Sequence, residues 1–185
     1  MFRKLATALF VLACNGVVAA AEVVDAAYTL HPGDKIEVSV WKEPDLQKQL
    51  VISPDGKMSL PLAGEFLAAG KTVAQVRTEI ETRLKTLMTE PVVTVSIMDV
   101  NGNVAYVIGQ VNKPGALVMN PRINVLQALS LTGGGTPFAK LDNIIIVRGA
   151  ASGQRVLSFR YGQVAEGKHL EQNVILESGD VVIVP

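Results

Sequence analysis

Two carboxylates and a tryptophan stand close together near the start of the chain. Glu43 and Asp45 flank Pro44, and Trp41 lies two residues before the first of them. Paired carboxylates can carry out acid–base chemistry on a glycosidic bond, and a tryptophan ring can stack on a sugar. With Asp55 they define one hypothesis, an enzyme acting on a glycan. The alternative is that Trp41 ends an alternating strand as a core or interface residue, and that the carboxylates lie in a loop.

Other patterns that could support catalysis point to structural roles instead. The run Gly133–Gly135 lacks the glycine-lysine ending and the following helix of a phosphate-binding loop, so it predicts a helix stop and a turn. His31 and His169, the two histidines, have no partner at metal-ligand spacing, and we expect both to be exposed. No Gly-x-Ser-x-Gly frame is present. The sequence therefore predicts no enzyme, no metal and no cofactor, and it favours a binding or assembly role.

Length and composition bound the class of protein. The chain has 185 residues, of which 49% are hydrophobic and 5% aromatic, enough for one domain or two small ones. The formal net charge is zero, with 17 basic and 17 acidic residues. Because no basic stripe is present, the sequence predicts no nucleic-acid partner.

The N-terminus has the pattern of an export signal. Arg3 and Lys4 precede the apolar run LATALFVLA, which is too short to span a membrane, and small residues offer cleavage after Ala21. We therefore predict that residues 1–21 are a signal peptide and that the protein is exported to a bacterial periplasm. Cys14, the only cysteine, is either a lipidation site in a loose lipoprotein box or a small hydrophobe within the signal core.

A short phrase occurs twice, as LHPGD near the start and as LESGD near the end, each time before an alternating or apolar strand. Gly33 with Asp34, and Gly179 with Asp180, are read as turn residues whose carboxylates bond nearby backbone N–H groups. A catalytic or metal-binding carboxylate is the alternative. We expect the last strand, residues 181–184, to complete the sheet of the second half of the chain or to pair with the first copy of the phrase.

The remaining pattern predicts two small α+β units. In the first, strands at 36–40 and from Val93 surround a hairpin at Ser53–Gly56 and a helix that runs from the N-cap Thr72 to Leu87. In the second, a short helix is expected over 125–131. The strands expected around that helix are 104–108, 144–147, 156–159, 174–176 and 181–184. Between the units, Asn101-Gly102-Asn103 is either a hairpin turn or a boundary.

Several ordered motifs resemble a known family. The first half resembles the polysaccharide biosynthesis/export domain through the motifs at 28–34, 51–56, 60–64, 70–72 and 91–95. The second half, from AYVIGQVNKPG at 105–115 to the triple glycine, resembles a soluble-ligand-binding β-grasp domain. Together they resemble the outer-membrane polysaccharide export proteins of Gram-negative bacteria. The expected organisation is a signal peptide at 1–21, an export domain at 22–100 and a β-grasp domain at 101–185.

The resemblance implies conduction rather than catalysis. It implies a homo-oligomeric ring, built by a repeated heterologous contact, that conducts exopolysaccharide or capsule toward the outer membrane. Implied partners are the exopolysaccharide, an inner-membrane polysaccharide co-polymerase and a separate outer-membrane pore or β-barrel. Longer members carry a C-terminal amphipathic membrane helix, and we expect this chain to be a short form without it. A monomeric periplasmic module that binds an oligosaccharide or small ligand is the alternative.

The residues singled out by these motifs are assigned structural roles. Gly109, Pro114 and Gly115 are expected to shape the β-grasp turn, and Gly133 to end the short helix. In the first unit, the residues expected to shape turns are Gly33, Asp34, Gly56 and Gly64, with Gly179 and Asp180 repeating the same device at the end of the chain.

Overall fold

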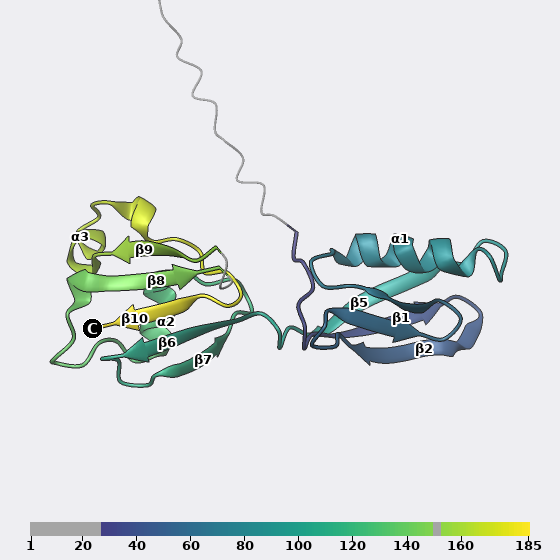
Figure 1. Ribbon diagram of the computed structural model, residues 1–185, viewed down its shortest axis with the longest axis horizontal. Helices are drawn as coiled ribbons and strands as arrows, with labels where there is room; N and C mark the ends of the chain where they lie inside the picture. Colours follow the sequence, from purple (N-terminus) through teal and green to yellow (C-terminus); the bar gives the residue numbers. More distant parts are fainter. Residues whose placement is uncertain (1–26, 150–152) are drawn as a thin grey trace, which may run out of the picture.

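The computed structural model describes residues 27–149 and 153–185. The predicted signal peptide and Cys14 lie outside the described residues. The rest folds as two α+β units set end to end and joined by one thin connection (Figure 1). Each unit has its own hydrophobic core, one drawn from residues 30–95 and the other from residues 105–184. The predicted α+β fold class is thus confirmed.

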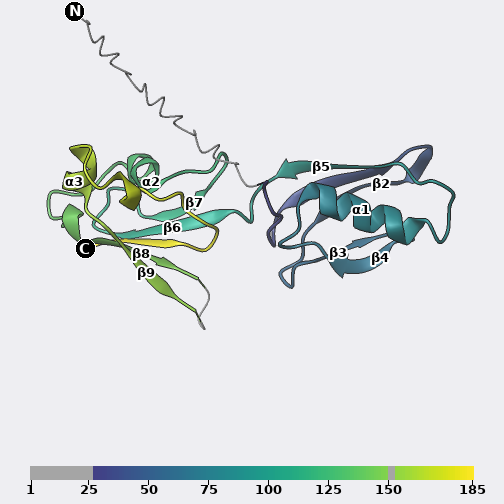
Figure 2. The same cartoon turned by 90° about the horizontal axis from the view of Figure 1, so that it is seen from above.

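The first unit is an antiparallel sheet with a helix packed on it. Its sheet has the order β2-β1-β5, beside a two-stranded ladder of β3 and β4. The bounds are β1 (Lys35–Val40), β2 (Glu43–Val51), β3 (Lys57–Leu60), β4 (Gly64–Leu67), α1 (Val73–Leu84) and β5 (Val93–Asp99). Helix α1 packs against β5 and buries Val76, Ile80 and Leu84 (Figure 2). Burying this apolar stripe supplies most of the helix's stability.

Helix α1 starts where its sequence signature predicts and stops earlier. Thr72 and Gln75 form the reciprocal bonds of a capping box. The helix ends at Leu84, however, and Leu87 is exposed, contrary to the prediction. The Leu87 N–H donates to the carbonyl of Leu84, and the Thr86 hydroxyl donates to the carbonyl of Arg83. These three-residue bonds tighten the last turn and end the α-helical ladder.

Two expectations about β2 were wrong. The turn at Ser53–Gly56 forms, with the Gly56 N–H donating to the Ser53 carbonyl at 2.8 Å, but the strands on its two sides belong to different sheets. The chain before the turn continues the β1 ladder, because Ile52 exchanges backbone bonds with the segment around Asp34. The segment from Glu43, expected to be a loop, is the start of β2. Its proline is tolerated because β2 is an edge strand.

The second unit is a mixed five-stranded sheet with the order β7-β6-β10-β8-β9. The bounds are β6 (Val104–Gly109), β7 (Gly115–Val118), α2 (Val125–Leu131), β8 (Ile144–Arg148), β9 (Arg155–Phe159), α3 (Tyr161–Ala165) and β10 (Val181–Val184). Strand β10 lies at the centre, parallel to β6 and antiparallel to β8, while α2 covers one face (Figure 2). The β-grasp expectation is confirmed, and the last strand completes the sheet of its own unit.

Some elements of the second unit differ from the prediction. Residues 174–176 form no strand, since the segment makes only an isolated bridge between Ile175 and Asn124. Helix α3 was missed because its N-cap, Arg160, makes no side-chain capping bond and so leaves no signature. Two 3₁₀ turns, Leu141–Asn143 and Leu170–Gln172, were also missed. Within residues 27–149 and 153–185, no helix has the length and apolar character to span a membrane.

Candidate functional site between the two units

The repeated phrase folds into the same turn twice. In the first copy, the His31 N–H donates to Asp34 Oδ2 at 2.8 Å and the Asp34 N–H donates back to the His31 carbonyl at 3.1 Å. In the second, the Glu177 N–H donates to Asp180 Oδ2 at 2.8 Å and the Asp180 N–H to the Glu177 carbonyl at 3.0 Å. The third position of each turn has a positive φ, which favours glycine: Gly33 and Gly179. We call these segments, 31–34 and 177–180, the twin turns.

The twin turns meet at a single residue of the connection, Gly102. Asp34 Oδ1 accepts the Gly102 N–H at 2.8 Å, and the Ser178 hydroxyl donates to the Gly102 carbonyl at 2.9 Å. A Cβ on Gly102 would lie 2.3 Å from the carbonyl oxygen of Pro32, so no side chain fits there. The connection is itself a tight turn, closed from the Asn103 N–H to the Val100 carbonyl, and it joins two different sheets. Both units therefore bond to the backbone of the same residue, Gly102.

Asp34 is fully buried and is satisfied without a basic partner in hydrogen-bonding contact. Besides the backbone of His31 and Gly102, it accepts the Tyr28 hydroxyl at 2.6 Å. Three donors on one buried carboxylate satisfy the rule that buried polar groups are paired. Burial, together with this hydrogen bond, raises the pKa of Tyr28 far above its ordinary value. The phenol therefore stays protonated and holds its ring in place beside the carboxylate.

Asp180 is equally buried but is neutralised by an arginine from β8. Arg148 donates through Nε to Oδ1 at 2.9 Å and through Nη2 to Oδ2 at 2.7 Å, a bidentate pair. The same guanidinium bonds Glu177 and the carbonyl of Ile175. The bond to Asp180 is the main cause that raises the pKa of Arg148, and burial opposes it. This network fixes the second turn to its own sheet.

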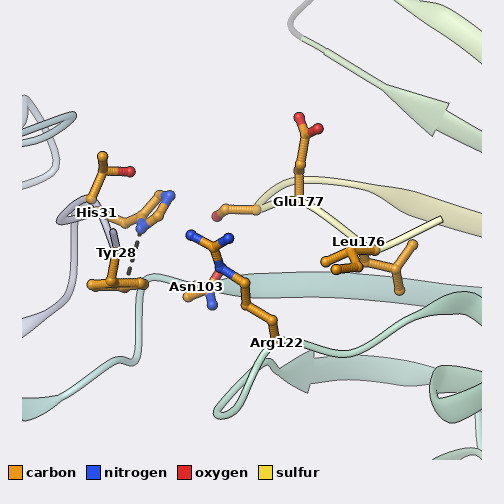
Figure 3. A pocket seen from close by; sticks show the side chains of 9 residues that line it. Tyr28, His31, Asn103, Arg122, Leu176 and Glu177 are labelled. Carbon is orange, nitrogen blue, oxygen red and sulfur yellow. Dashed lines mark hydrogen bonds between the residues drawn. The ribbon is translucent and has the colours of Figure 1, made fainter. Parts of the chain in front are cut away.

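A cavity of about 510 Å³ opens between the twin turns (Figure 3). Tyr28 and His31 face it from the first unit, and Arg122 reaches into it from the loop before α2. Glu177 lines it from the second unit, with its carboxylate bonded to Arg148. Its lining residues are Tyr28, Thr29, His31, Asn103, Arg122, Ile175, Leu176, Glu177 and Ser178. A second cavity of about 760 Å³ shares Tyr28, Asn103, Arg122 and Ile175 with it and adds apolar residues such as Met98 and Met119.

The polar groups around these cavities are committed mainly to one another. The Asn103 amide donates to the carbonyl of Met119 at 2.6 Å, and His31 Nδ1 lies 3.1 Å from the Tyr28 hydroxyl. His31 is thus half-buried and bonded, contrary to the expectation that it is simply exposed, whereas His169 is exposed beside Glu171. Among the described residues, no group of three or more His, Cys, Asp or Glu side chains could hold a metal ion. We call this contact between the two units, made by the twin turns and Gly102, the joint. Beside it the two units leave room for a small ligand.

The carboxylates of the enzyme hypothesis do not gather at this joint. Glu43 lines a separate groove beside Trp41, and Asp45 lies on the exposed edge strand β2. Asp55 lies in the turn after that strand, with its Oδ2 atom 3.6 Å from the Lys57 amine. None of the three lines either inter-unit cavity.

The other glycines and the proline named from the sequence lie apart from the cavities. A Cβ on Gly109 would lie 2.1 Å from the Val184 carbonyl oxygen, so this glycine allows the close approach of β6 to β10. Gly133 follows α2 with a positive φ and accepts a bond from the Asn112 side chain at 2.7 Å. The others lie in turns or at strand ends: Gly56, Gly64, Pro114 and Gly115.

Sequence reasoning missed Gly102, Asn103 and Arg122 as parts of the joint. A signal for Gly102 was present, because Asn-Gly-Asn between two alternating strands marks a tight turn. Nothing local indicated that Asp34 or Ser178 would reach it, since those bonds join residues 68 and 76 positions apart.

Two family models match consecutive parts of the chain. One, described as polysaccharide biosynthesis/export protein, matches residues 22–98, and the other, an SLBB domain, matches residues 103–184. The first half of the chain is thus a polysaccharide biosynthesis/export domain and the second half an SLBB domain. The resemblance inferred from the sequence motifs is thereby confirmed, and the joint at Gly102 lies in the short interval between the two matched segments.

Characterised relatives are similar over most of this chain. The capsule polysaccharide export outer membrane protein CtrA of Neisseria meningitidis serogroup B is 28% identical over 176 residues, which cover 84% of this chain and 43% of the relative. The EPS I polysaccharide export outer membrane protein EpsA of Ralstonia nicotianae is 25% identical over 180 residues, with 84% and 46% covered. The polysialic acid transport protein KpsD of Escherichia coli is 28% identical over 124 residues, with 66% and 22% covered. The chain spans less than half the length of these relatives.

Proposed function

We propose that this protein is a periplasmic, non-enzymatic component of an exopolysaccharide or capsule export apparatus. In this proposal, residues 1–21 direct export, and residues 22–100 and 101–185 are the two domains. Copies of the chain form, or join, a ring that conducts polymer toward the outer membrane. The partners are an inner-membrane polysaccharide co-polymerase on one side and a separate outer-membrane pore on the other.

One observation supports this proposal beyond the family matches: both units bond to the backbone of Gly102. Asp34 holds its N–H and Ser178 holds its carbonyl, and the surrounding atoms leave no room for a side chain. A fixed angle between two units lets every copy present the same pair of surfaces to the next. A heterologous contact closes into a ring only if that rotation is reproducible. A rigid joint therefore suits a ring subunit better than a freely hinged pair of domains.

The proposal is tested by assembly and by complementation. The protein is purified from the periplasm and its mass is measured by native mass spectrometry and light scattering. In parallel, the gene is deleted, and surface polysaccharide is quantified with and without a plasmid copy. A discrete high-order oligomer, together with loss and recovery of surface polymer, is the expected result. The proposal would be refuted if the protein is a strict monomer at micromolar concentration and deletion of its gene leaves surface polymer unchanged. That result would favour the monomeric ligand-binding module, for which the 510 Å³ cavity would be the site.

A further inference from the structure

Trp41 is the only tryptophan of the chain, and 72% of its surface is exposed. It was expected in a core or an interface; it lies outside the core, in the turn between β1 and β2. Because β1 is antiparallel to β5, with Val40 opposite Val93 and Lys35 opposite Asp99, this turn lies at the end of the first unit away from Gly102. The ring is thus remote from the joint and from the second unit.

The backbone that presents Trp41 is held firmly. The Trp41 N–H donates to the carbonyl of Val92 at 2.9 Å, extending the β1–β5 ladder by one bond. The next residue, Lys42, has a φ of 64°, a left-handed conformation that is uncommon for a residue with a side chain. Such conformations persist where the surrounding structure demands them, often at ligand clamps. The turn therefore presents the indole in a defined place.

An open groove of about 330 Å³ runs beside the indole, and its walls combine apolar, neutral polar and charged side chains, the last from Lys42 and Glu43. Trp41, Pro44 and Val92 supply apolar surface, and Val92 is 61% exposed. Ser39, Gln47 and Thr94 supply hydroxyl and amide groups. We call this the Trp41 groove. Polar residues are ordinary on the outer face of a sheet. This face differs because its polar side chains lie next to the exposed indole of Trp41.

The apolar and the hydroxyl- and amide-bearing walls together match one class of ligand. A pyranose ring has an apolar face of C–H groups and a rim of hydroxyls, so it can stack on an aromatic ring while its edge bonds to amides and hydroxyls. A protein interface would call for a broader desolvated apolar centre than one indole with a valine and a proline. Ser39 and Thr94 lie opposite each other in the β1–β5 register, so their hydroxyls are on one face of the sheet. Gln47 is on the same face, because its amide bonds Glu37, which lies two residues before Ser39 on β1.

We propose that the Trp41 groove binds a pyranose unit of the exported polysaccharide, with the indole stacked on the sugar ring. This inference rests on the proposed function, because that function supplies the polymer. The groove lies at the outer end of the first unit, where an incoming chain can reach it without entering the inter-unit cavities.

The experiment uses the periplasmic protein and oligosaccharides made by partial acid hydrolysis of the surface polysaccharide of the organism that encodes the chain. Cellohexaose serves as a second, neutral probe. Because Trp41 is the sole tryptophan, its fluorescence and its single indole N–H signal in ¹⁵N–¹H spectra report the groove directly. For variants that lack the Trp41 fluorophore, sugar binding is compared by saturation-transfer NMR on the sugar protons. The expected result is a saturable fluorescence change and a shift of the indole signal by the native oligosaccharides.

Three variants sharpen the test. Trp41→Ala is expected to weaken binding tenfold or more, whereas Trp41→Phe, which keeps a ring, recovers part of it. Phe138→Ala is the matched control, because Phe138 is an 82% exposed aromatic of the second unit. It is expected to bind as the wild type does. Since both side chains are exposed, circular dichroism should show unchanged folding in all three. Equal binding by Trp41→Ala and the wild type would overturn the proposal.

The outcomes separate this inference from the proposed function. If no probe shifts the indole signal of a chain that still restores surface polymer, the groove proposal is wrong and the export function stands. If the indole signal moves only when the protein concentration rises, Trp41 is a contact between copies, and the saccharide proposal is again wrong. A third outcome is that saccharide binds at Trp41, the chain is monomeric, and deletion of its gene leaves surface polymer unchanged. In that case saccharide binding in the Trp41 groove is correct and the proposed ring function is wrong.

Discussion

Replacing Gly102 by alanine would test the joint between the two units most directly. The added Cβ would lie 2.3 Å from the Pro32 carbonyl oxygen, 2.8 Å from the His31 Cβ and 3.0 Å from Asp34 Oδ1. The nearest atoms belong to backbone and a β-carbon, so the connection itself must move. Such movement lengthens or breaks the bond from Gly102 to the buried Asp34 carboxylate.

The expected loss is the sum of two effects. Forcing a methyl group into a filled site costs about 1–3 kcal/mol. Weakening a hydrogen bond to a charged, buried acceptor costs about 1.5–3 kcal/mol, although Asp34 keeps two other donors. We therefore expect Gly102→Ala to lower the free energy of unfolding by about 2.5–6 kcal/mol. For a chain of 185 residues this corresponds to a fall in Tm of roughly 5–24 °C.

The assay is differential scanning calorimetry combined with small-angle X-ray scattering. Because the joint holds two separate cores, we also expect the units to unfold less cooperatively, with a calorimetric enthalpy that exceeds the van't Hoff value. The radius of gyration should rise as the units separate. Gly153→Ala is the matched control, since its Cβ would meet open space without a positive φ. A Gly102→Ala chain as stable as this control, with an unchanged scattering profile, would refute the reasoning.

Three further predictions concern the twin turns. Arg148→Met leaves the buried Asp180 without its charge partner, so unfolding by urea should show a loss of about 3–5 kcal/mol, largely recovered by adding Asp180→Asn. Ser178→Ala removes the donor to the Gly102 carbonyl and should cost about 0.5–1.5 kcal/mol in the same assay, and no loss would mean that this bond does not hold the units together. The pKa of Tyr28 is raised above its ordinary value of 10.0. The neutral phenol therefore stabilises the fold fully below pH 10.0, and this stabilisation is lost only as the pH rises through the raised pKa of the folded protein. The difference in absorbance at 295 nm between wild type and Tyr28→Phe should therefore show no phenolate one unit above the ordinary pKa, about pH 11, while the protein stays folded.

Features encoded within a few residues were predictable from the sequence. The capping boxes at Thr72 and Asn124 fixed the starts of both main helices. The Gly-Asp turns were recognisable because a glycine at the third position and a side-chain acceptor at the fourth form a local device. The alternation after each turn predicted β1 and β10. In all these cases the information lies within one turn or one strand.

Features that depend on distant partners were not predictable from the sequence. The start of β2 at Glu43 contains a proline and two acidic residues, a composition that indicates a loop, and only its pairing with β1 makes it a strand. Likewise, the residues of the joint come from four separate segments that the fold brings together. Of the two places expected for Trp41, a core or an interface, the turn after β1 excludes the core, because it leaves the side chain exposed.

The two turns are not interchangeable, and their difference explains why the phrase occurs twice. In the first copy the second turn position is Pro32, whose carbonyl packs against Gly102, and Asp34 still has an oxygen free of the turn to accept the Gly102 N–H. In the second copy Arg148 donates to both carboxylate oxygens of Asp180, which ties that carboxylate to β8 rather than to Gly102. The contact passes instead to the second turn position, where the Ser178 hydroxyl bonds the Gly102 carbonyl. One turn thus offers an acceptor and the other a donor, which are the partners that the backbone N–H and C=O of one residue require.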